Sequence, residues 1–201
     1  MRSVNNKSVF AIVLAAGSAS RFGSAKQLAM LNGMPLVGYA SRLATQTCGS
    51  RSVLVAGHQW RAVADACTPW AGYLVVNELH QHGIGSSLAI AVRAIRHAAD
   101  AVVVMLADQP LISAAHVNKL IAAWSGDEHE IIASAYAGTR GAPALFARGC
   151  FPRLESLSAD QGARSLFDEP GFKLRAIECA AAAIDIDTIA DLTRLERNAH
   201  S

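Results

Sequence analysis

Residues 9–26 read VFAIVLAAGSASRFGSAK, an apolar stretch that runs directly into a loop with two glycines. The apolar residues predict a buried strand, and Gly17 and Gly23 permit the tight backbone turns of a loop. The loop also carries Arg21 and Lys26, whose cations suit phosphate oxygens. In α/β proteins such a loop lies at the C-terminal edge of the sheet, where ligands bind. The stretch therefore predicts a site for a polyanion such as a nucleoside triphosphate.

Two common phosphate-binding loops do not fit these residues. The Walker pattern requires a glycine, four residues and then Gly-Lys-Ser/Thr. Here five residues separate Gly17 from Gly23, and two more precede Lys26. The dinucleotide pattern requires glycines at its first, third and sixth positions, which this loop lacks. The alternative for an isolated loop of this type is that its glycines only form turns and its cations are solvated.

The remainder of the chain alternates apolar runs rich in Val and Ile with helical patterns. This alternation predicts an α/β fold, with a mostly parallel sheet covered on both faces and right-handed crossovers. We expect strands at residues 10–15, 52–56, 74–76, 101–106 and 131–136, and helices at residues 36–47, 86–99, 114–124 and 188–197. Residues 137–146 are typical of a loop with a short strand, and residues 158–170 of a turn entering a short helix.

Length and composition favour one enzyme-sized domain spanning residues 1–201, with residues 1–8 as a flexible N-terminal extension. The net charge of +2 is too small to indicate nucleic-acid binding. The sequence shows neither a signal peptide nor a membrane-spanning run, so we expect a cytoplasmic protein without a membrane partner. Four dispersed cysteines without a CxxC pair indicate reduced thiols. A monomer is the default expectation.

A second informative segment is VVVMLADQPLI, residues 102–112. Its apolar run predicts a buried strand that ends just before Asp108, and Pro110 prevents the strand from continuing. A carboxylate at that edge is well placed to hold Mg²⁺ against phosphate oxygens. The alternative is that Asp108 only caps the following turn.

A third segment places Asn77 after a strand and a glycine-serine turn with Gly85, Ser86 and Ser87 before a helix. Helix N-terminal amides and serine hydroxyls can bind a base, a ribose or a phosphate. The alternative is that Ser86 or Ser87 is simply the helix N-cap. His80 and His82 lie nearby without carboxylate partners, which indicates an exposed loop more than a metal site.

The last informative run is AIDIDTIADLTRL, residues 183–195. Asp187 or Thr188, together with Asp191, can cap the final helix. Ile184 and Ile186 suggest a short strand that directs Asp185 and Asp187 to its opposite face. Asp185 is our candidate for a second metal-binding carboxylate.

These motifs together resemble the MobA-like NTP transferase family, and in particular molybdenum cofactor cytidylyltransferase-like proteins. The loop keeps Leu14, Ala15, Ala16, Gly17, Arg21, Gly23 and Lys26 of the family signature, with Phe22 in place of its methionine. The resemblance also covers the Asp-Gln-Pro motif and the terminal DIDT run, and thus nearly the whole chain. It implies a three-layer α/β/α Rossmann-like nucleotidyltransferase fold of the nucleotide-diphospho-sugar transferase type.

The resemblance also implies roles for individual residues. Lys26, Arg21 and Asp108 would be catalytic, and Asp108 and Asp185 would bind the cofactor Mg²⁺. The residues that would bind nucleotide are Leu14, Ala15, Ala16, Gly17, Arg21, Lys26, Asn77, Gly85, Ser86 and Asp108. Those that would bind the acceptor are Arg140, Gly141, Asp160 and Arg164. Ala142 and Ala159 stand where many relatives have histidine and glycine, which affects the prediction of the acceptor more than that of the nucleotide. Ordinary surface charge is the alternative for Arg140 and Arg164.

The implied reaction is transfer of CMP from CTP to a phosphorylated acceptor, with release of pyrophosphate. The LAAG form of the loop favours CTP, because the guanylyl branch of the resembling proteins usually carries LAGG. A molybdopterin-type acceptor, with a molybdoenzyme receiving the product, follows from the resemblance alone. Two alternatives stay open: transfer to a sugar or polyol phosphate, and a non-catalytic factor that handles nucleotide or cofactor during maturation of a molybdoenzyme.

Overall fold

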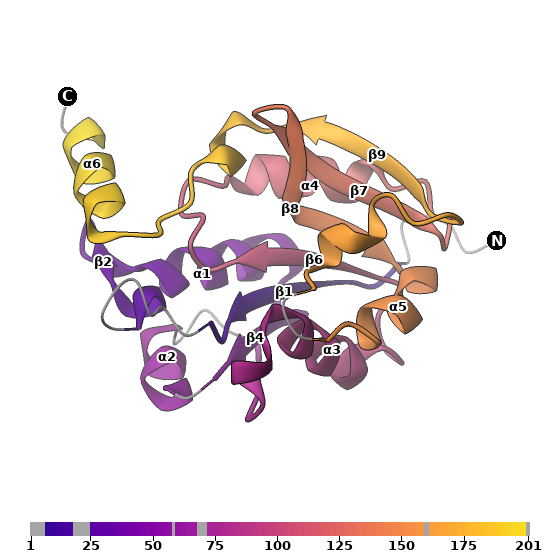
Figure 1. Cartoon of the computed structure of the whole chain (residues 1–201), viewed down its shortest axis with the longest axis horizontal. Coiled ribbons are helices and arrows are strands. Elements are labelled where there is room, and N and C mark those ends of the chain that lie inside the picture. Colours follow the sequence, from indigo (N-terminus) through magenta and orange to yellow (C-terminus); the bar gives the residue numbers. More distant parts are fainter. Residues whose placement is uncertain (1–6, 18–24, 58, 68–71, 159–160, 200–201) are drawn as a thin grey trace.

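The computed structural model describes residues 7–17, 25–57, 59–67, 72–158 and 161–199. Seven strands form one sheet in the order β5-β4-β1-β6-β8-β7-β9 (Figure 1). A two-stranded sheet of β2 (Met30–Leu31) and β3 (Met34–Pro35) accompanies it. The strands of the large sheet are β1 (Val9–Ala15), β4 (Ser52–Ala56), β5 (Tyr73–Val76), β6 (Ala101–Leu106), β7 (Glu130–Tyr136), β8 (Thr139–Ala147) and β9 (Lys173–Glu178).

Helices cover both faces of this sheet. They are α1 (Leu36–Cys48), α2 (Trp60–Cys67), α3 (Ile84–Ile95), α4 (Ala114–Ala123) and α5 (Phe151–Glu155). A further helix, α6 (Ile189–Ala199), packs instead beside β2. Successive residues of β1 enter opposite layers: Val13 packs in the core shared with α1, α2 and α4, and Ile12 in the core shared with α3 and α5. The predicted three-layer α/β/α architecture with a mostly parallel sheet is therefore confirmed.

Strand β8 differs from the short strand predicted within residues 137–146. It has nine residues and pairs antiparallel with both β6 and β7. Ala137 and Gly138 have φ values of 46° and 73°, the left-handed conformation of a two-residue hairpin turn, so the chain returns directly beside β7. All other pairings in the large sheet are parallel. The C-terminal ends of β1, β4, β5, β6, β7 and β9 consequently meet at one edge.

Several local expectations were wrong. Residues 184–187 have no strand, because the backbone there bonds to the loop after β6 and not to a neighbouring strand. Helix α3 begins at Ile84 with Gly83 at the N-cap, so neither Ser86 nor Ser87 caps it. Helices α2 and α5 and strand β9 were not predicted, since their short segments carry weak periodicity. Thr188 and Asp191 do form the predicted capping box of α6, in which each accepts the other's backbone N–H.

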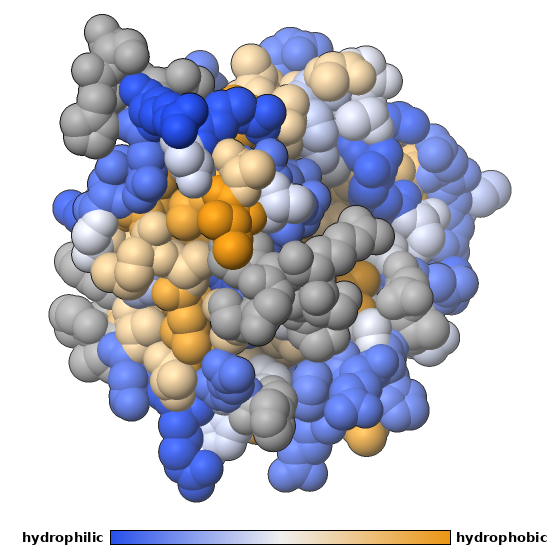
Figure 2. Space-filling model, turned by 60° about the vertical axis from the view of Figure 1, so that its left-hand side comes forward, coloured by the Kyte–Doolittle hydropathy of each residue, from blue (hydrophilic) through white to orange (hydrophobic). Residues whose placement is uncertain are grey.

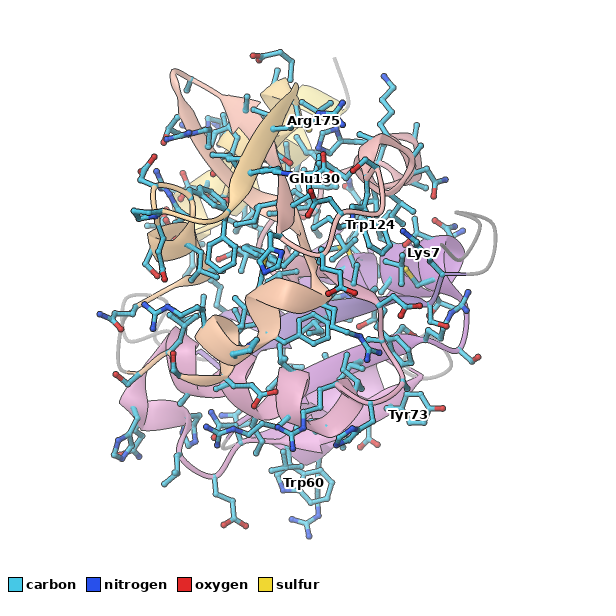
Figure 3. The ribbon with its side chains drawn as sticks, turned by 90° about the vertical axis from the view of Figure 1, so that its right-hand side faces the viewer. Lys7, Trp60, Tyr73, Trp124, Glu130 and Arg175 are labelled. Atoms are coloured by element: carbon cyan, nitrogen blue, oxygen red, sulfur yellow. The ribbon has the colours of Figure 1, made fainter. Side chains whose placement is uncertain are left out.

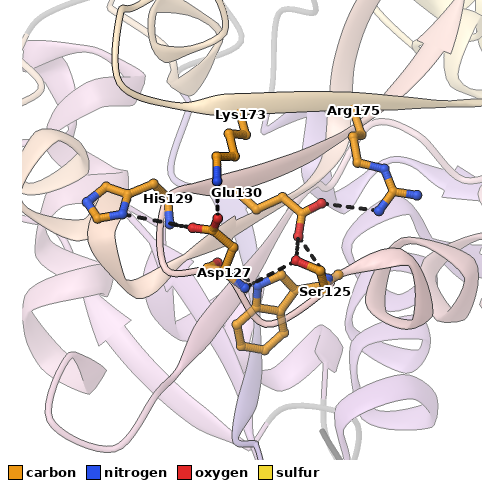
Figure 4. A network of polar contacts seen from close by, with 7 residues as sticks. Ser125, Asp127, His129, Glu130, Lys173 and Arg175 are labelled. Atoms are coloured by element: carbon orange, nitrogen blue, oxygen red, sulfur yellow. Dashed lines mark hydrogen bonds and ion pairs between the residues drawn. The ribbon is translucent and has the colours of Figure 1, made fainter. Parts of the chain in front are cut away.

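The N-terminal edge of the sheet is closed by polar contacts. Glu130, at the start of β7, accepts hydrogen bonds from the backbone N–H and hydroxyl of Ser125 and pairs with Arg175 of β9 at 3.2 Å (Figure 4). Asp127 accepts from Lys173 and from the backbone N–H of His129. The Glu130 side chain is only 5% exposed. Hydrogen bonds from Ser125 and the Arg175 cation nevertheless outweigh its desolvation and lower its pKa.

The segment before β1 joins the same edge. The ammonium of Lys7 lies 4.5 Å from the centre of the Trp124 ring, and the backbone N–H of Ser8 donates to Asp100 at 2.9 Å. Lys7, Trp124, Glu130 and Arg175 lie on one side of the molecule, away from Trp60 and Tyr73 (Figure 3). Residues 1–6, most of the predicted N-terminal extension, lie outside the described part of the chain.

The face that carries β2 and α6 shows apolar side chains beside charged ones (Figure 2). Met30 of β2 is 52% exposed, and Ile189 at the start of α6 is 62% exposed. Leu192 and Leu195 of α6 instead pack inward against a small cluster that contains Leu31 and Ile186. None of the helices in the described ranges is both long and apolar enough to cross a membrane.

Candidate active site

Asp108 lies at the C-terminal edge of the sheet, as predicted. It follows β6 in a turn that is tied to β1, because the backbone N–H of Ala107 donates to the carbonyl of Leu14. The backbone carbonyl of Asp108 itself accepts a hydrogen bond from the N–H of Ile186 at 3.0 Å. The site is therefore built from segments far apart in sequence, and the backbone holds them together.

Lys26 points into this edge from a short 3-10 helix, Lys26–Leu28. The neighbouring Gln27 fastens that helix to the sheet, since its side-chain amide donates to the carbonyl of Ala15 at 3.1 Å. The Lys26 ammonium lies 2.7 Å from Oδ2 of Asp108 and 2.9 Å from Oδ1 of Asp187. Burial alone would lower the pKa of Lys26, but the two carboxylates outweigh it and raise that pKa. Lys26 is therefore a fixed cation at the predicted phosphate site.

Asp185 lies near Asp108, although the predicted strand that was to present it is absent from residues 184–187. Partial desolvation and the Asp108 carboxylate raise the pKa of Asp185, while a hydrogen bond with the Gln109 side chain partly opposes the shift. Gln109 also donates to the carbonyl of Ala182 at 3.1 Å. Gln109 thus connects the end of β6 to the segment that carries Asp185.

Two buried oxygens at this edge have no hydrogen-bond partner among the described residues: Oδ1 of Asp108 and Oε1 of Gln109. An unpaired buried oxygen is costly unless a ligand satisfies it. Carboxylate oxygens are the donors that Mg²⁺ and similar hard cations prefer. The described residues contain no cluster of three His, Cys, Asp or Glu suited to a metal. The unpaired Oδ1 of Asp108 is thus a single oxygen donor of the kind that such a cation takes.

The predicted nucleotide-binding residues at the end of the first strand have little side chain available for a ligand, and their role stays a prediction. The side chains of Leu14, Ala15 and Ala16 are buried in the core, whereas Gly17 is exposed just beyond β1. The carbonyls of Leu14 and Ala15 are already occupied by Ala107 and Gln27. Arg21 lies outside the described residues, so its predicted role stays a prediction.

Asn77 follows β5 and is buried, with 2% of its surface exposed. Its side-chain NH₂ group donates to the hydroxyls of Ser86 and Ser87, both at 2.9 Å. Its side-chain oxygen, Oδ1, accepts from the backbone N–H of Leu79. Gly85 is buried within the first turn of α3. Asn77 therefore fixes the start of α3 at the sheet edge, and nucleotide binding by Asn77, Gly85 and Ser86 stays a prediction.

The predicted acceptor residues gather at the β7–β8 hairpin. Arg140 pairs with Asp168 at 2.8 Å, and Arg164 donates to the hydroxyl of Thr139 at 2.6 Å. Gly141 packs so closely against the Tyr136 hydroxyl that a Cβ there would collide with it. Burial and the Asp185 carboxylate raise the pKa of Tyr136, and Arg164 opposes the shift. Tyr136 thus lies near both Asp185, predicted to bind metal, and Arg164, predicted to bind the acceptor. Asp160 lies outside the described residues.

Sequence reasoning missed two members of this constellation. The sequence predicts Asp187 only as a helix cap or as a residue on the same strand face as Asp185, yet its carboxylate contacts Lys26. The spacing of two residues between Asp185 and Asp187 is the sequence signal that both carboxylates belong to one site. Tyr136 was assigned only to the end of a strand, and no local pattern distinguished it.

The sequence profile of the MobA-like NTP transferase domain matches residues 11–176. The chain belongs to this family. It is similar to the purine catabolism protein PucB of Bacillus subtilis, with 28% identity over 188 residues that span 89% of each chain. It is also similar to nicotine blue oxidoreductase of Paenarthrobacter nicotinovorans, with 29% identity over 93% of this chain and 96% of the relative.

A solved structure extends this MobA-like assignment to the fold. Rv0371c of Mycobacterium tuberculosis, in a complex with manganese, superposes with a TM-score of 0.78 and 27% identity over 94% of this chain and 98% of that one. The family membership and the shared fold identify this chain as a MobA-like nucleotidyltransferase. The matched range includes Lys26 and Asp108 but ends before Asp185 and Asp187.

Proposed function

We propose that this MobA-like nucleotidyltransferase transfers CMP from CTP to the phosphate of a molybdopterin-type acceptor and releases pyrophosphate. One observation carries the proposal: the Lys26 ammonium contacts one oxygen of Asp108, while the other oxygen is buried without a partner in the described residues. A cation and a divalent-metal ligand at one sheet edge suit a nucleoside triphosphate. The LAAG form of residues 14–17, typical of cytidylyl enzymes, supports CTP.

The reaction requires alignment and charge neutralisation more than covalent help from the protein. An oxygen of the acceptor phosphate attacks the α-phosphorus of CTP. The bond from that phosphorus to the bridging oxygen of the β-phosphate breaks, and the electron pair leaves with pyrophosphate. Lys26 neutralises charge on the phosphates, and we assign the same role to Arg21.

Asp108 and Asp185 are the residues that would hold Mg²⁺. The bound ion would supply charge neutralisation for the triphosphate in the transition state. Asp108 offers the buried oxygen, and Asp185 offers a carboxylate whose raised pKa reflects a charge that a cation would stabilise. The manganese complex of Rv0371c supports a divalent cation in this fold.

The acceptor would approach from the β7–β8 hairpin. Arg140 and Arg164 lie there, each already held by one neighbour, Asp168 and Thr139 respectively. Guanidinium groups of this kind bind phosphate through paired hydrogen bonds. This cation pair supports an anionic acceptor next to the predicted metal site.

The test measures pyrophosphate release with CTP, GTP, ATP or UTP, each with Mg²⁺, in the presence and absence of molybdenum-loaded pterin. We expect release only with CTP and pterin together. Release with a sugar phosphate or polyol phosphate in place of pterin would reassign the acceptor. Nucleotide binding without turnover under any condition would contradict catalysis and favour a non-catalytic maturation factor.

We further propose that a molybdoenzyme receives the product at the face that carries β2 and α6. Support comes from the exposure of Met30 and Ile189, the latter two residues after Asp187. Ile189→Ser should slow transfer of the product to an apo-molybdoenzyme and leave pyrophosphate release unchanged. Tyr73→Ser, which alters a residue of β5 that is 57% exposed, is the matched control. Equal effects of the two variants would contradict this contact.

A further inference from the structure

Asp187 contacts the one lysine of the candidate active site from a segment outside the matched family range. Its Oδ1 lies 2.9 Å from the Lys26 ammonium, although the two residues are 161 positions apart. Asp108 contacts the same ammonium at 2.7 Å. The lysine therefore binds two carboxylates that come from distant parts of the chain.

The backbone on both sides of Asp187 is fixed. Ile186 is fully buried beside Leu31 and Leu36, and its N–H donates to the carbonyl of Asp108. The N–H of Asp187 donates to Asp191, which also caps α6 together with Thr188. The position of the Asp187 carboxylate thus follows from the packing of its neighbours, in contrast to a freely moving surface acid.

Fold stability does not explain this contact. The Asp187 side chain is 63% exposed, and ion pairs with such an exposed partner contribute little to folding. The Lys26 side chain, in contrast, is only 19% exposed. The contact therefore acts mainly on where the ammonium lies.

The position of that ammonium matters for Asp108. A lysine with Asp108 as its only partner would settle fully against that carboxylate and neutralise it. Because Asp187 also accepts from this ammonium, the ammonium is shared between two carboxylates; it contacts Oδ2 of Asp108 and leaves Oδ1 without a partner among the described residues. Lysine has three N–H donors, of which these two contacts use two. The third remains for a phosphate oxygen.

We propose that Asp187 is a positioning residue: it holds the Lys26 ammonium where it meets the triphosphate and keeps one oxygen of Asp108 free for a divalent cation. The inference rests on the proposed nucleotidyl transfer and deepens it. It assigns to Asp187 a role that acts through Lys26, without contact to the reacting atoms.

A double-mutant cycle on the full chain tests the coupling. The dissociation constant of CTP with Mg²⁺ is measured by calorimetry for the wild type, Asp187→Ala, Lys26→Met and the double variant. We expect Asp187→Ala to weaken CTP binding about tenfold in the wild-type background, the loss of a well-placed charged hydrogen bond. In the Lys26→Met background the same change should leave binding unchanged or tighten it, because a carboxylate without its lysine only repels the triphosphate.

Further variants separate positioning from structure. Asp187→Asn keeps an oxygen that can accept from Lys26 and should recover part of the affinity. Asp191→Ala removes the carboxylate half of the α6 capping box and should lower the melting temperature, with a smaller effect on the dissociation constant of CTP. Asp65→Ala, on the exposed side of α2, is the matched control and should change neither the melting temperature nor the dissociation constant of CTP. Titration with Mn²⁺ alone should show weaker binding to Asp187→Ala than to Asp65→Ala, and this readout does not depend on turnover.

Four outcomes would overturn the proposal. An equal change of affinity in the wild-type and Lys26→Met backgrounds would show that Asp187 acts independently of Lys26. A loss in Asp191→Ala as large as that in Asp187→Ala would show that only the local fold matters. If the wild type binds CTP and Asp187→Ala binds it equally well, this inference alone fails. If the wild type binds no nucleoside triphosphate, the proposed function fails with it.

Discussion

The two edges of the large sheet carry polar clusters of similar composition but opposite character. At the N-terminal edge, Glu130 is buried, and both its oxygens are paired, one with Ser125 and one with Arg175 (Figure 4). At the C-terminal edge, Asp108 is paired with Lys26 through one oxygen, and its other oxygen is buried without a partner in the described residues. Each cluster joins segments that are distant in sequence.

The pKa shifts of the acidic side chains also differ between the two edges. At the N-terminal edge the contacts of Glu130 outweigh its desolvation, and its pKa falls. At the C-terminal edge desolvation and the neighbouring Asp108 raise the pKa of Asp185. The first edge stabilises its negative charges with partners from the protein, whereas the second leaves negative charge that a bound cation would stabilise. The same sheet thus carries a stabilising cluster at one edge and the proposed functional cluster at the other.

The largest expected effect on turnover is that of Asp108, one of the two aspartates that flank β6. Asp108→Ala should reduce turnover about a thousandfold or more, because it removes the ligand of the proposed metal, while the fold is retained. Asp100→Ala, at the opposite end of the same strand, should leave turnover unchanged and lower the melting temperature, since Asp100 holds Ser8. Pyrophosphate release and thermal unfolding measure the two effects. Substantial turnover in Asp108→Ala would refute the metal assignment.

Glu130→Gln should invert this pattern. The glutamine keeps an oxygen for Ser125 but loses the charge that pairs with Arg175, so we expect unfolding to become easier by about 1–2 kcal/mol. Turnover should not change, because Glu130 lies at the other edge. Denaturant unfolding with a parallel pyrophosphate assay checks both. A drop in turnover without a loss of stability would mean that the two edges are coupled.

The pH dependence of stability distinguishes the edges further. Because the folded-state pKa of Glu130 is lowered below its ordinary value of 4.5, its contribution is fully present above that value. The contribution is lost as the pH falls through the lowered folded-state pKa. Denaturant unfolding of the wild type should therefore become easier in this acidic range, and Glu130→Gln should show a smaller dependence on pH there. Parallel pH profiles for the two proteins would contradict the assignment.

The smallest expected effect concerns the acceptor. Tyr136→Phe removes the hydroxyl that packs against Gly141 and should raise the KM for the acceptor about threefold to tenfold, with the KM for CTP unchanged. Tyr73→Phe, on the exposed surface of β5, is the control. An equal rise in both KM values would place Tyr136 outside the acceptor site.

Local sequence patterns predicted the part of the molecule that local physics controls. The apolar runs predicted β1, β4 and β6, and Asp108, two residues after the end of β6, was correctly placed at the C-terminal edge. The hairpin that makes β8 antiparallel depends on Ala137 in a left-handed conformation, which its side chain does not favour. The contact of Asp187 with Lys26 depends on the packing of Ile186. No local pattern encodes contacts of that range.

The hydrogen bond from Ile186 to the carbonyl of Asp108 also bears on the order in which the protein is made. Every strand of the large sheet has been synthesised once the chain reaches Glu178, the last residue of β9. Lys26 acquires its second carboxylate only when residue 187 has followed. During translation, a nascent chain can therefore complete its large sheet before it can complete the site that is proposed to handle the nucleotide. A ribosome stalled between these two points would display a sheet with an unfinished site.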